Sequence, residues 1–464
     1  MIDGGDTTLA RRLERYRLAA QTLVARDDPP PVSTPSAVLA EHLAAATDGE
    51  VLATHEGIVV RCEVPARSIP VDRERLARLP GQPPADAPLV CLDTETTGLA
   101  TAAGTVAFLI GLGWWEGDRF RQVRLLLPDH AHERALLTAL AATIVPAAWL
   151  VTYNGRGFDW PLLVARYRLA RRAAPAHAGH LDLLPIVRRL FRHRMDDARL
   201  RTAEAQLLGL HRIGDVDGSE IPGRYLRFLR TGMPDELVEV VRHNDQDVRS
   251  LARLLGHLEV QLGNPDRRAG VPAGDLAGLA RAFTSEHRLG EALACLDDAV
   301  ARADPIAPTS DVGIAPNPAR HGEEAWWSPK TPADFGGRPR PRLEGLGPPR
   351  TAAFHVPWSQ ERLAIDRAHL LRRLGRYAEA AEAWASLAAG VGRTAIVASI
   401  ELAKVQEHRL RDPVGATRTT MRGLAIVDRR RQLGRPEPAL EADLYRRLRR
   451  LRRRAAAGGQ RSVA

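Results

Sequence analysis

The sequence predicts an α/β domain, built on a mixed sheet with helices on both faces and followed by an α-helical region. Three observations support this fold class. Apolar runs of strand length alternate with helical periodicity over residues 88–262, helical patterns alone occupy residues 270–305 and 356–455, and the segments 80–88 and 306–355 are rich in proline and glycine. A chain of 464 residues is also long enough for two or three domains.

Composition narrows the classes of protein. Hydrophobic residues make up 44% of the chain, enough for ordinary cores, and we expect neither a signal peptide nor a membrane span. Cys62, Cys91 and Cys295 have no metal-ligand spacing, so we expect reduced, buried thiols in a cytoplasmic protein. The composition is typical of a GC-rich bacterial genome.

The formal net charge of +10 permits a polyanionic partner but does not require one. Arginine supplies nearly all the cations, and its densest cluster is LYRRLRRLRRR, which begins at Leu444. Two interpretations of this cluster stay open: a solvated helix end, or a contact with nucleic acid.

Local patterns predict the individual elements. The N-terminal extension, residues 1–87, holds a basic amphipathic helix around residues 9–25 and the strand-like stretch EGIVVRCEVP. From Leu89, LVCLDTE predicts a buried strand, and the following apolar stretch predicts two strands joined by a turn at Glu116-Gly117-Asp118. The remaining elements are a helix over residues 131–145, a strand at AWLVTYN, a helix from Phe158, a short strand leading into a helix at GHLDLLPIVRRLFR, and a long helix over residues 234–260.

The helical region contains three similar segments, at residues 286–300, 373–387 and 410–425. Each places small residues where two helices would pack closely, and together they resemble tetratricopeptide helical hairpins. A plain helical bundle explains the pattern nearly as well. A repeat of this kind would recruit a protein partner, with residues 306–355 as a linker that interrupts it.

Two acids at the end of the first strand of the sheet domain need explaining. Asp93 and Glu95 are two residues apart, so on a strand both carboxylates project from one face, ~7 Å apart. At an effective dielectric constant near 20, two charges at that distance repel by ~2.4 kcal/mol. Solvent, protonation or a divalent cation would relieve the repulsion, and oxygen ligands suit Mg²⁺ or Mn²⁺. Taken alone, two solvated acids remain an alternative.

Two further motifs place acids on other elements. Asp159 opens a helix after the strand that ends at Asn154, where a helix N-terminus by itself favours a negative charge. His243 and Asp247 are one helical turn apart and share a face, as a hydrogen-bonded pair in a packed helix also would. Asp245 points elsewhere.

In this order, the motifs DTETTGL, NGRGFD and HNDQD resemble those of the DEDD exonucleases of the ribonuclease H-like superfamily. The stretches FLIGLG, HLDLL, RLRTAEAQLLGL and IPGRYLRFLRTG are similar to the YprB-type ribonuclease H-like domain of bacteria, and the resemblance covers residues 88–260. It implies a five-stranded mixed sheet and a 3′–5′ exonuclease that acts on single-stranded DNA or RNA with two divalent ions, Mg²⁺ or Mn²⁺.

The resemblance also implies roles for individual residues. Acids matching Asp93, Glu95, Asp159 and Asp247 bind two metals in the superfamily, with the first acid bridging both. His243 is the candidate general base, although it stands at the spacing of the tyrosine class of these enzymes. Four residues are candidate contacts to the terminal nucleotide, with strand-end, loop-bracing or helix-capping roles as alternatives: Thr96, Thr97, Asn154 and Asp182.

Two other functions stay open. The first is a low-activity, nuclease-like domain that serves as a nucleic-acid-binding adaptor, whose helical repeats recruit a protein partner. The second is a structure-selective endonuclease, because ribonuclease H-like sheets also support internal cleavage. The presence of all four expected acids argues against an inactive domain.

Overall fold

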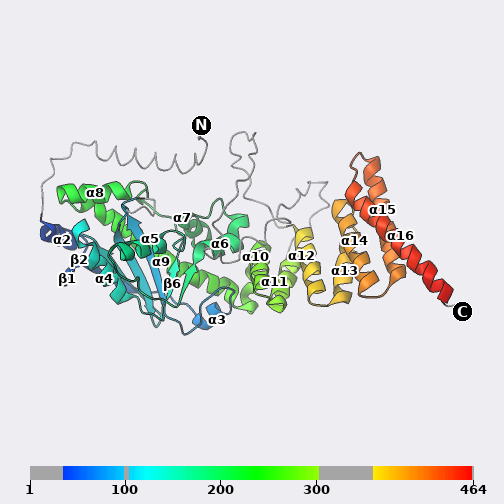
Figure 1. Cartoon of the computed structure of the whole chain (residues 1–464), viewed down its shortest axis with the longest axis horizontal. Coiled ribbons are helices and arrows are strands. Elements are labelled where there is room, and N and C mark those ends of the chain that lie inside the picture. The colour runs from blue at the N-terminus through cyan, green and yellow to red at the C-terminus, as the bar shows by residue number, and fades with distance from the viewer. Residues whose placement is uncertain (1–34, 99–103, 303–358, 462–464) are drawn as a thin grey trace. The chain divides into compact units, whose positions relative to one another are not determined.

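The computed structural model describes residues 35–98, 104–302 and 359–461 (Figure 1). These residues form two compact units, one that ends at His287 and one that begins at Arg288. The helix predicted around residues 9–25 and the linker predicted over residues 306–355 lie outside the described residues.

The first unit is built on a seven-stranded mixed sheet with the strand order β1-β2-β5-β4-β3-β6-β7. Antiparallel pairing joins β1 to β2, β2 to β5, β5 to β4 and β4 to β3, whereas β3, β6 and β7 pair in parallel. The strands are Glu50–Thr54 (β1), Gly57–Ser68 (β2), Leu89–Thr96 (β3), Ala107–Glu116 (β4), Arg119–Leu126 (β5), Trp149–Thr152 (β6) and Gly179–Asp182 (β7).

The sheet has two strands more than the five that we expected. Strands β3 to β7 are the expected ones, and β1 and β2 come from the N-terminal extension. The stretch EGIVVRCEVP does form a strand, β2, but it pairs with β5 from Val60 opposite Leu126 to Ser68 opposite Arg119. The expectation was wrong because an apolar strand pattern does not identify its partner, and β2 covers the edge that β5 would otherwise expose.

Helices flank the sheet (Figure 1). Gly111 of β4 faces the long helix α9, since a Cβ at this glycine would lie 2.8 Å from Val248 of that helix. The neighbouring Leu112 points to the opposite face and shares a core with Leu136 and Leu163. The helices of this unit are Ser36–Ala46 (α2), Arg73–Ala77 (α3), Glu133–Thr143 (α4), Asp159–Leu169 (α5), Leu183–Phe191 (α6), Leu200–Ala203 (α7), Ile221–Thr231 (α8), Asp235–Leu258 (α9) and Ala273–Ser285 (α10).

Most elements of the first unit lie where their patterns predicted them. β4 and β5 meet at the predicted turn, where Gly117 adopts a φ of +63° that a glycine accepts without strain. The long helix predicted over residues 234–260 is α9. Cys62 and Cys91 are buried, as is Cys295 in the second unit.

The second unit is helical, as predicted. Its helices are Leu289–Arg302 (α11), Gln360–Arg373 (α12), Tyr377–Ala388 (α13), Gly392–His408 (α14), Pro413–Gln432 (α15) and Pro438–Arg461 (α16), and each packs against the next. The fully buried Trp384 of α13 packs in a core with Ala368 and Ala398, small residues that let neighbouring helices approach closely. Within the described residues of both units, the helices lack the combined length and apolar character that a membrane span requires.

Candidate active site

Asp93 and Glu95 lie near the carboxyl end of β3, the strand at which the sheet changes from antiparallel to parallel pairing. The preceding stretch, Leu89 to Leu92, is buried and anchors the strand in the sheet. Because alternate residues of a strand face the same side, both carboxylates project toward α9. The pair therefore lies beyond a buried strand of an α/β sheet, where sites in such folds are usually formed.

A glycine opposite Asp93 allows α9 to approach the strand. Gly111 of β4 pairs with Asp93, and a Cβ there would lie only 2.0 Å from Oδ1 of Asn244. Asn244 is fully buried, and its Nδ2 donates to Oδ2 of Asp93 at 2.8 Å. The amide therefore holds the Asp93 carboxylate in one orientation.

Asp159 reaches the cluster from the first turn of α5. Its Oδ1 accepts a hydrogen bond from the Thr94 hydroxyl, with 2.5 Å between the oxygens, which links α5 to β3. The carboxylate is buried, and burial raises the pKa of Asp159 to about 6, even though the bond from Thr94 favours its charged form.

His243 and Asp247 approach from α9. Nδ1 of His243 lies 2.7 Å from Oδ1 of Asp215, so that carboxylate fixes the ring. Nε2 of the same ring lies 3.7 Å from Oδ2 of Asp247 and 4.0 Å from Oε1 of Glu95. The imidazole therefore presents one nitrogen to the acidic cluster while the other is held by an acid outside it.

The cation Arg212 contacts this group of acids. Its guanidinium binds Glu204 through two bonds of 2.6 Å, lies 3.1 Å from Asp215 and also contacts Asp247. Glu204 is fully buried, and the Ser250 hydroxyl donates to it as well. Burial alone would lower the pKa of Arg212, but its bonds with Glu204 and the charge of Asp247 raise it, so the group stays charged.

Burial and mutual repulsion act on the acids of the cluster. Burial is the main cause that raises the pKa of Asp93, and the charges of Asp247, Glu95 and Asp159 add to it. The pKa of Glu95 is raised by burial and then by Asp247. Burial also raises the pKa of Asp247, although His243 and Arg212 oppose it. A cation bound among these carboxylates would relieve the repulsion.

The donor set fits a hard divalent cation, because the clustered carboxylate oxygens are the ligands that Mg²⁺ and Mn²⁺ prefer. The side chains are not closed around an ion, however. Among the described residues, no three His, Cys, Asp or Glu side chains are arranged so that they could hold a metal as they stand. Protein groups occupy the carboxylates instead: Asn244 binds Asp93, Thr94 binds Asp159 and Arg212 binds Asp247. Binding of an ion by these carboxylates would therefore require these side chains to rotate.

The four candidate nucleotide contacts have local structural partners. The Thr96 hydroxyl donates to a backbone oxygen two residues on, at 2.6 Å, and the Thr97 hydroxyl accepts from the amide just before β4, at 3.0 Å. Asp182 caps α6 and also accepts from the backbone N–H of Asn154, at 2.7 Å. Asn154 has a φ of +70°. These contacts shape the loops that follow β3 and β6.

The structure thus brings Asp93, Glu95, Asp159, His243 and Asp247 to one end of the sheet. The residues that hold them in place were not predicted from the sequence. Asn244 stands inside the motif HNDQD and Gly111 inside FLIGLG, but only the strand register shows that they meet. Arg212, Asp215 and Glu204 lie outside the quoted acidic motifs, and no pattern distinguished them. As expected, Asp245 points elsewhere, and its Oδ1 lies 3.5 Å from Nε of Arg124 on β5.

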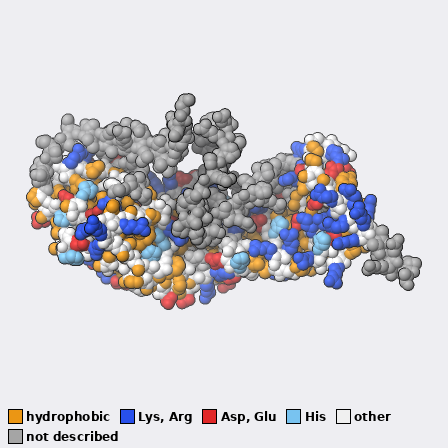
Figure 2. Space-filling view, in the orientation of Figure 1, with side chains coloured by type: hydrophobic (Ala, Val, Ile, Leu, Met, Phe, Trp, Pro, Cys, Tyr) orange, Lys and Arg blue, Asp and Glu red, His pale blue; other side chains and the backbone are white. Residues whose placement is uncertain are grey.

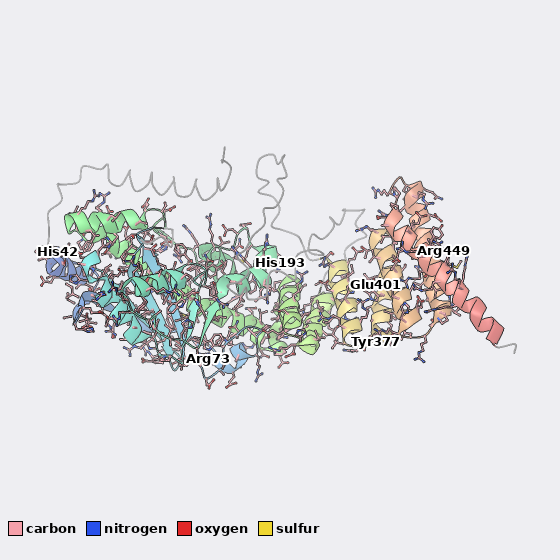
Figure 3. All side chains as sticks on the ribbon, in the orientation of Figure 1. His42, Arg73, His193, Tyr377, Glu401 and Arg449 are labelled. Atoms are coloured by element: carbon pink, nitrogen blue, oxygen red, sulfur yellow. The ribbon has the colours of Figure 1, made fainter. Side chains whose placement is uncertain are left out.

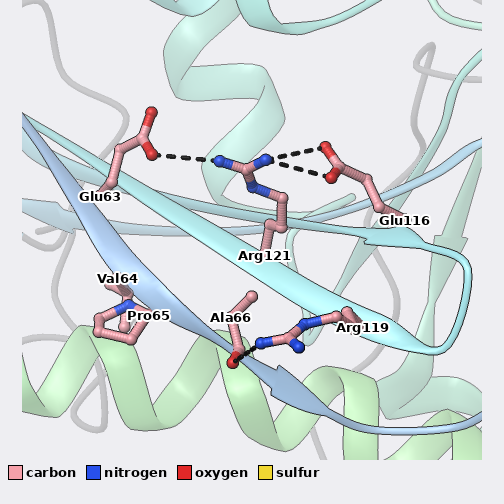
Figure 4. A pocket seen from close by; sticks show the side chains of 7 residues that line it. All are labelled: Glu63, Val64, Pro65, Ala66, Glu116, Arg119 and Arg121. Atoms are coloured by element: carbon pink, nitrogen blue, oxygen red, sulfur yellow. Dashed lines mark hydrogen bonds and ion pairs between the residues drawn. The ribbon is translucent and has the colours of Figure 1, made fainter.

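A separate hollow of about 400 Å³ lies at the hairpin end of β4 and β5 and does not include these acids (Figure 4). Arg121 lies there between Glu63 and Glu116, at 3.2 and 3.1 Å. Since these charges already neutralise one another, the acidic cluster is the stronger candidate for chemistry.

Comparison with known proteins agrees with this geometry. Residues 90–259 match the family model described as the RNase H superfamily. Over 176 residues, the chain is 40% identical to "Uncharacterized protein YprB" of Bacillus subtilis (strain 168), a match that covers 38% of this chain and 42% of that protein. The chain therefore spans less than half of the length of this relative. The segment that carries the acidic cluster is a ribonuclease H-like domain.

Proposed function

We propose that the protein is a metal-dependent 3′–5′ exonuclease of the DEDD type, which hydrolyses phosphodiester bonds at the end of single-stranded DNA or RNA. One observation carries the proposal. Acids from three separate elements, β3, α5 and α9, converge at one end of the sheet, and Nε2 of His243 lies 3.7 Å from Asp247 and 4.0 Å from Glu95. The ribonuclease H-like domain supports a nuclease-type chemistry but does not by itself define the substrate.

In this proposal, Asp93, Glu95, Asp159 and Asp247 would hold two ions, Mg²⁺ or Mn²⁺. Two such ions, when bound, supply Lewis-acid stabilisation to the attacking and leaving oxygens of a phosphoryl displacement. His243 takes the proton of the attacking water at Nε2, and Asp215 stabilises the resulting imidazolium through Nδ1.

The test uses the purified full chain with single strands of DNA and of RNA, each labelled at the 3′ or the 5′ end, in Mn²⁺ or in EDTA. We expect stepwise shortening from the 3′ end, which EDTA and the double substitution Asp93→Ala, Asp247→Ala both abolish. Asp118→Ala, at the exposed turn between β4 and β5, is the control for loss of an acid outside the cluster and should retain activity.

Other outcomes would point elsewhere. Internal products in Mn²⁺ would contradict the exonuclease and support a structure-selective endonuclease. Lack of metal-dependent cleavage of either nucleic acid, at high protein concentration, would support an adaptor role. The contacts proposed for Thr96, Thr97, Asn154 and Asp182 predict that their substitution weakens substrate binding more than it lowers turnover.

For the second unit, we propose tetratricopeptide-like hairpins that recruit a protein partner, in a cytoplasmic protein. The packing of each helix against the next supports this proposal, as do the small residues beside Trp384. An experimental structure in which successive helix pairs are related by a constant rotation would agree with it. Helix pairs without such a relation would indicate a plain bundle.

A further inference from the structure

The last helix of the second unit, α16, is unusually basic. Between Tyr445 and Arg454 it contains seven arginines and no acid. The side that packs against the rest of the unit is apolar, with Leu444, Leu448 and Leu451 buried. The arginines around this stripe fall into two groups with different environments.

The first group has a structural role. Arg447, Arg450 and Arg454 all bind Glu407 of α14, at 3.1, 2.6 and 2.8 Å. The Glu407 side chain is only 1% exposed, so it needs cationic partners in the folded protein. These three arginines fasten α16 to α14 through Glu407.

The second group faces away from Glu407. Arg446 lies 3.6 Å from Asp443, whereas Arg449, Arg452 and Arg453 are exposed and have no acidic partner among the described residues. Elsewhere in the unit, Arg367, Arg372 and Arg393 are each paired with an acid. The charge of this part of α16 is therefore not neutralised by acids as the charges of Arg367, Arg372 and Arg393 are.

An aromatic ring lies among these cations. Tyr445 is 44% exposed. It shares a helix face with Arg449, four positions on, and with Arg452, three positions beyond Arg449. A shallow hollow of about 520 Å³ follows that face, and it is lined by Ala442, Tyr445, Arg446, Leu448, Arg449 and Arg452. Figure 3 labels Arg449 on α16, and Figure 2 shows Lys and Arg side chains gathered over this end of the second unit.

We propose that Tyr445, Arg446, Arg449, Arg452 and Arg453, here called the basic face, bind single-stranded nucleic acid. The arginines contact phosphates, and the tyrosine ring stacks on a base. The nature of the polyanion rests on the proposed nuclease function. A membrane surface fits less well, because a helix that lies in a membrane interface inserts its apolar face, and that face of α16 is buried in the unit. The basic face thus holds a substrate strand on the same chain as the acidic cluster.

The experiment measures binding separately from cleavage. Fluorescence anisotropy of a labelled 20-nucleotide single strand, thymidine or uridine, is recorded with the full chain in EDTA at several salt concentrations. The double variant Arg449→Gln, Arg452→Gln should bind about tenfold more weakly, and its plot of log affinity against log salt should be shallower by about 1.4, since each lost phosphate contact removes about 0.7. Tyr445→Ala should weaken binding about tenfold without changing that slope, whereas Tyr445→Phe should bind like the wild type.

Arg373→Glu is the matched control, because it removes the same two units of net charge from an exposed position at the end of α12. It should change neither affinity nor slope. Equal effects of the control and of the double variant would overturn the proposal in favour of a net-charge effect. Unchanged binding in the double variant or in Tyr445→Ala would also overturn it, as would a defect seen only with anionic phospholipid vesicles.

The two proposals fail in different ways. Binding that depends on the basic face, in a protein that cleaves neither DNA nor RNA in Mn²⁺, would leave this inference standing and remove the exonuclease. Suppose instead that the Arg449→Gln, Arg452→Gln variant still shortens the strand in a metal-dependent way and binds the oligonucleotide with unchanged affinity. That result would remove this inference and leave the exonuclease standing. Since the substituted side chains are exposed, thermal melting should show the same stability for every variant.

Discussion

Replacing Asp93 by asparagine should stabilise the metal-free protein. Asparagine is nearly isosteric with aspartate and can still accept the hydrogen bond that Asn244 donates to Oδ2 at 2.8 Å. Burial raises the pKa of Asp93, and the charges of Asp247, Glu95 and Asp159 add to this effect. At a pH above that raised pKa, asparagine removes a charge that repels these three acids. A carboxylate ~7 Å away repels by ~2.4 kcal/mol at an effective dielectric constant near 20. The other acids add to this repulsion and Arg212 subtracts from it, so we expect a net gain of ~2 kcal/mol.

Differential scanning calorimetry in EDTA measures the effect. A gain of ~2 kcal/mol should raise the melting temperature of the first unit by about 4–8 °C. Addition of Mn²⁺ should then reverse the order, because a ligand that binds only the folded state stabilises the wild type and the variant lacks a ligand group. Asp118→Asn removes the same charge from the exposed turn, so it should melt like the wild type in both conditions.

Two results would refute this reasoning. A metal-free Asp93→Asn protein that melts below the wild type would show that the carboxylates do not repel one another as the geometry requires. An equal rise on addition of Mn²⁺ in the wild type and in the variant would show that Asp93 is not a ligand.

Three further substitutions test the surroundings of the cluster. Arg212→Ala leaves the fully buried Glu204 without its main partner and should cost about 3–5 kcal/mol in urea unfolding; a loss below about 1 kcal/mol would contradict the buried ion pair. Gly111→Ala places a Cβ 2.0 Å from Oδ1 of Asn244, so α9 must shift, at a cost of about 1–3 kcal/mol and with weaker Mn²⁺ binding; wild-type melting and Mn²⁺ affinity would contradict this close approach. His243→Ala should lower turnover about 10²-fold while Mn²⁺ binding, followed by calorimetry, persists; unchanged turnover would exclude a general base at this position.

The elements of the sheet could be predicted because their signals are local. Apolar runs such as Leu89–Leu92 identify buried strands, and glycine at position 117 marks the turn between β4 and β5. Strand partners are not local, and β2 shows the consequence. Its apolar pattern predicted a strand, but its pairing with β5 depends on a hydrogen-bond register between residues some 60 positions apart, as with Val60 and Leu126.

The acids could be predicted because their motifs are also local in the sequence, whereas the residues that hold them in place could not. Asp93 and Glu95 could be recognised from the sequence, because two neighbouring charges at the end of an apolar strand repel one another and need a compensating partner. Nothing in the sequence distinguishes Asn244 and Arg212 in this way, because asparagine and arginine are common on protein surfaces. Only the fold shows that Asn244 is fully buried against Asp93, and that the Arg212 guanidinium lies between Glu204 and Asp247.

Arg212 also explains how a chain with this cluster can fold without a bound metal. Buried carboxylates that repel one another oppose folding, and a nearby permanent cation offsets part of that cost. Glu204, outside the cluster, binds the Arg212 guanidinium, which also contacts Asp247. Asp93, Glu95 and Asp159 are therefore not needed to hold Arg212 in place. A divalent ion that binds Asp247 must then compete with Arg212 for one of its oxygens. If the cluster binds a metal, replacing the charge of Arg212 should therefore destabilise the fold and, by removing this competition, raise the affinity for the ion.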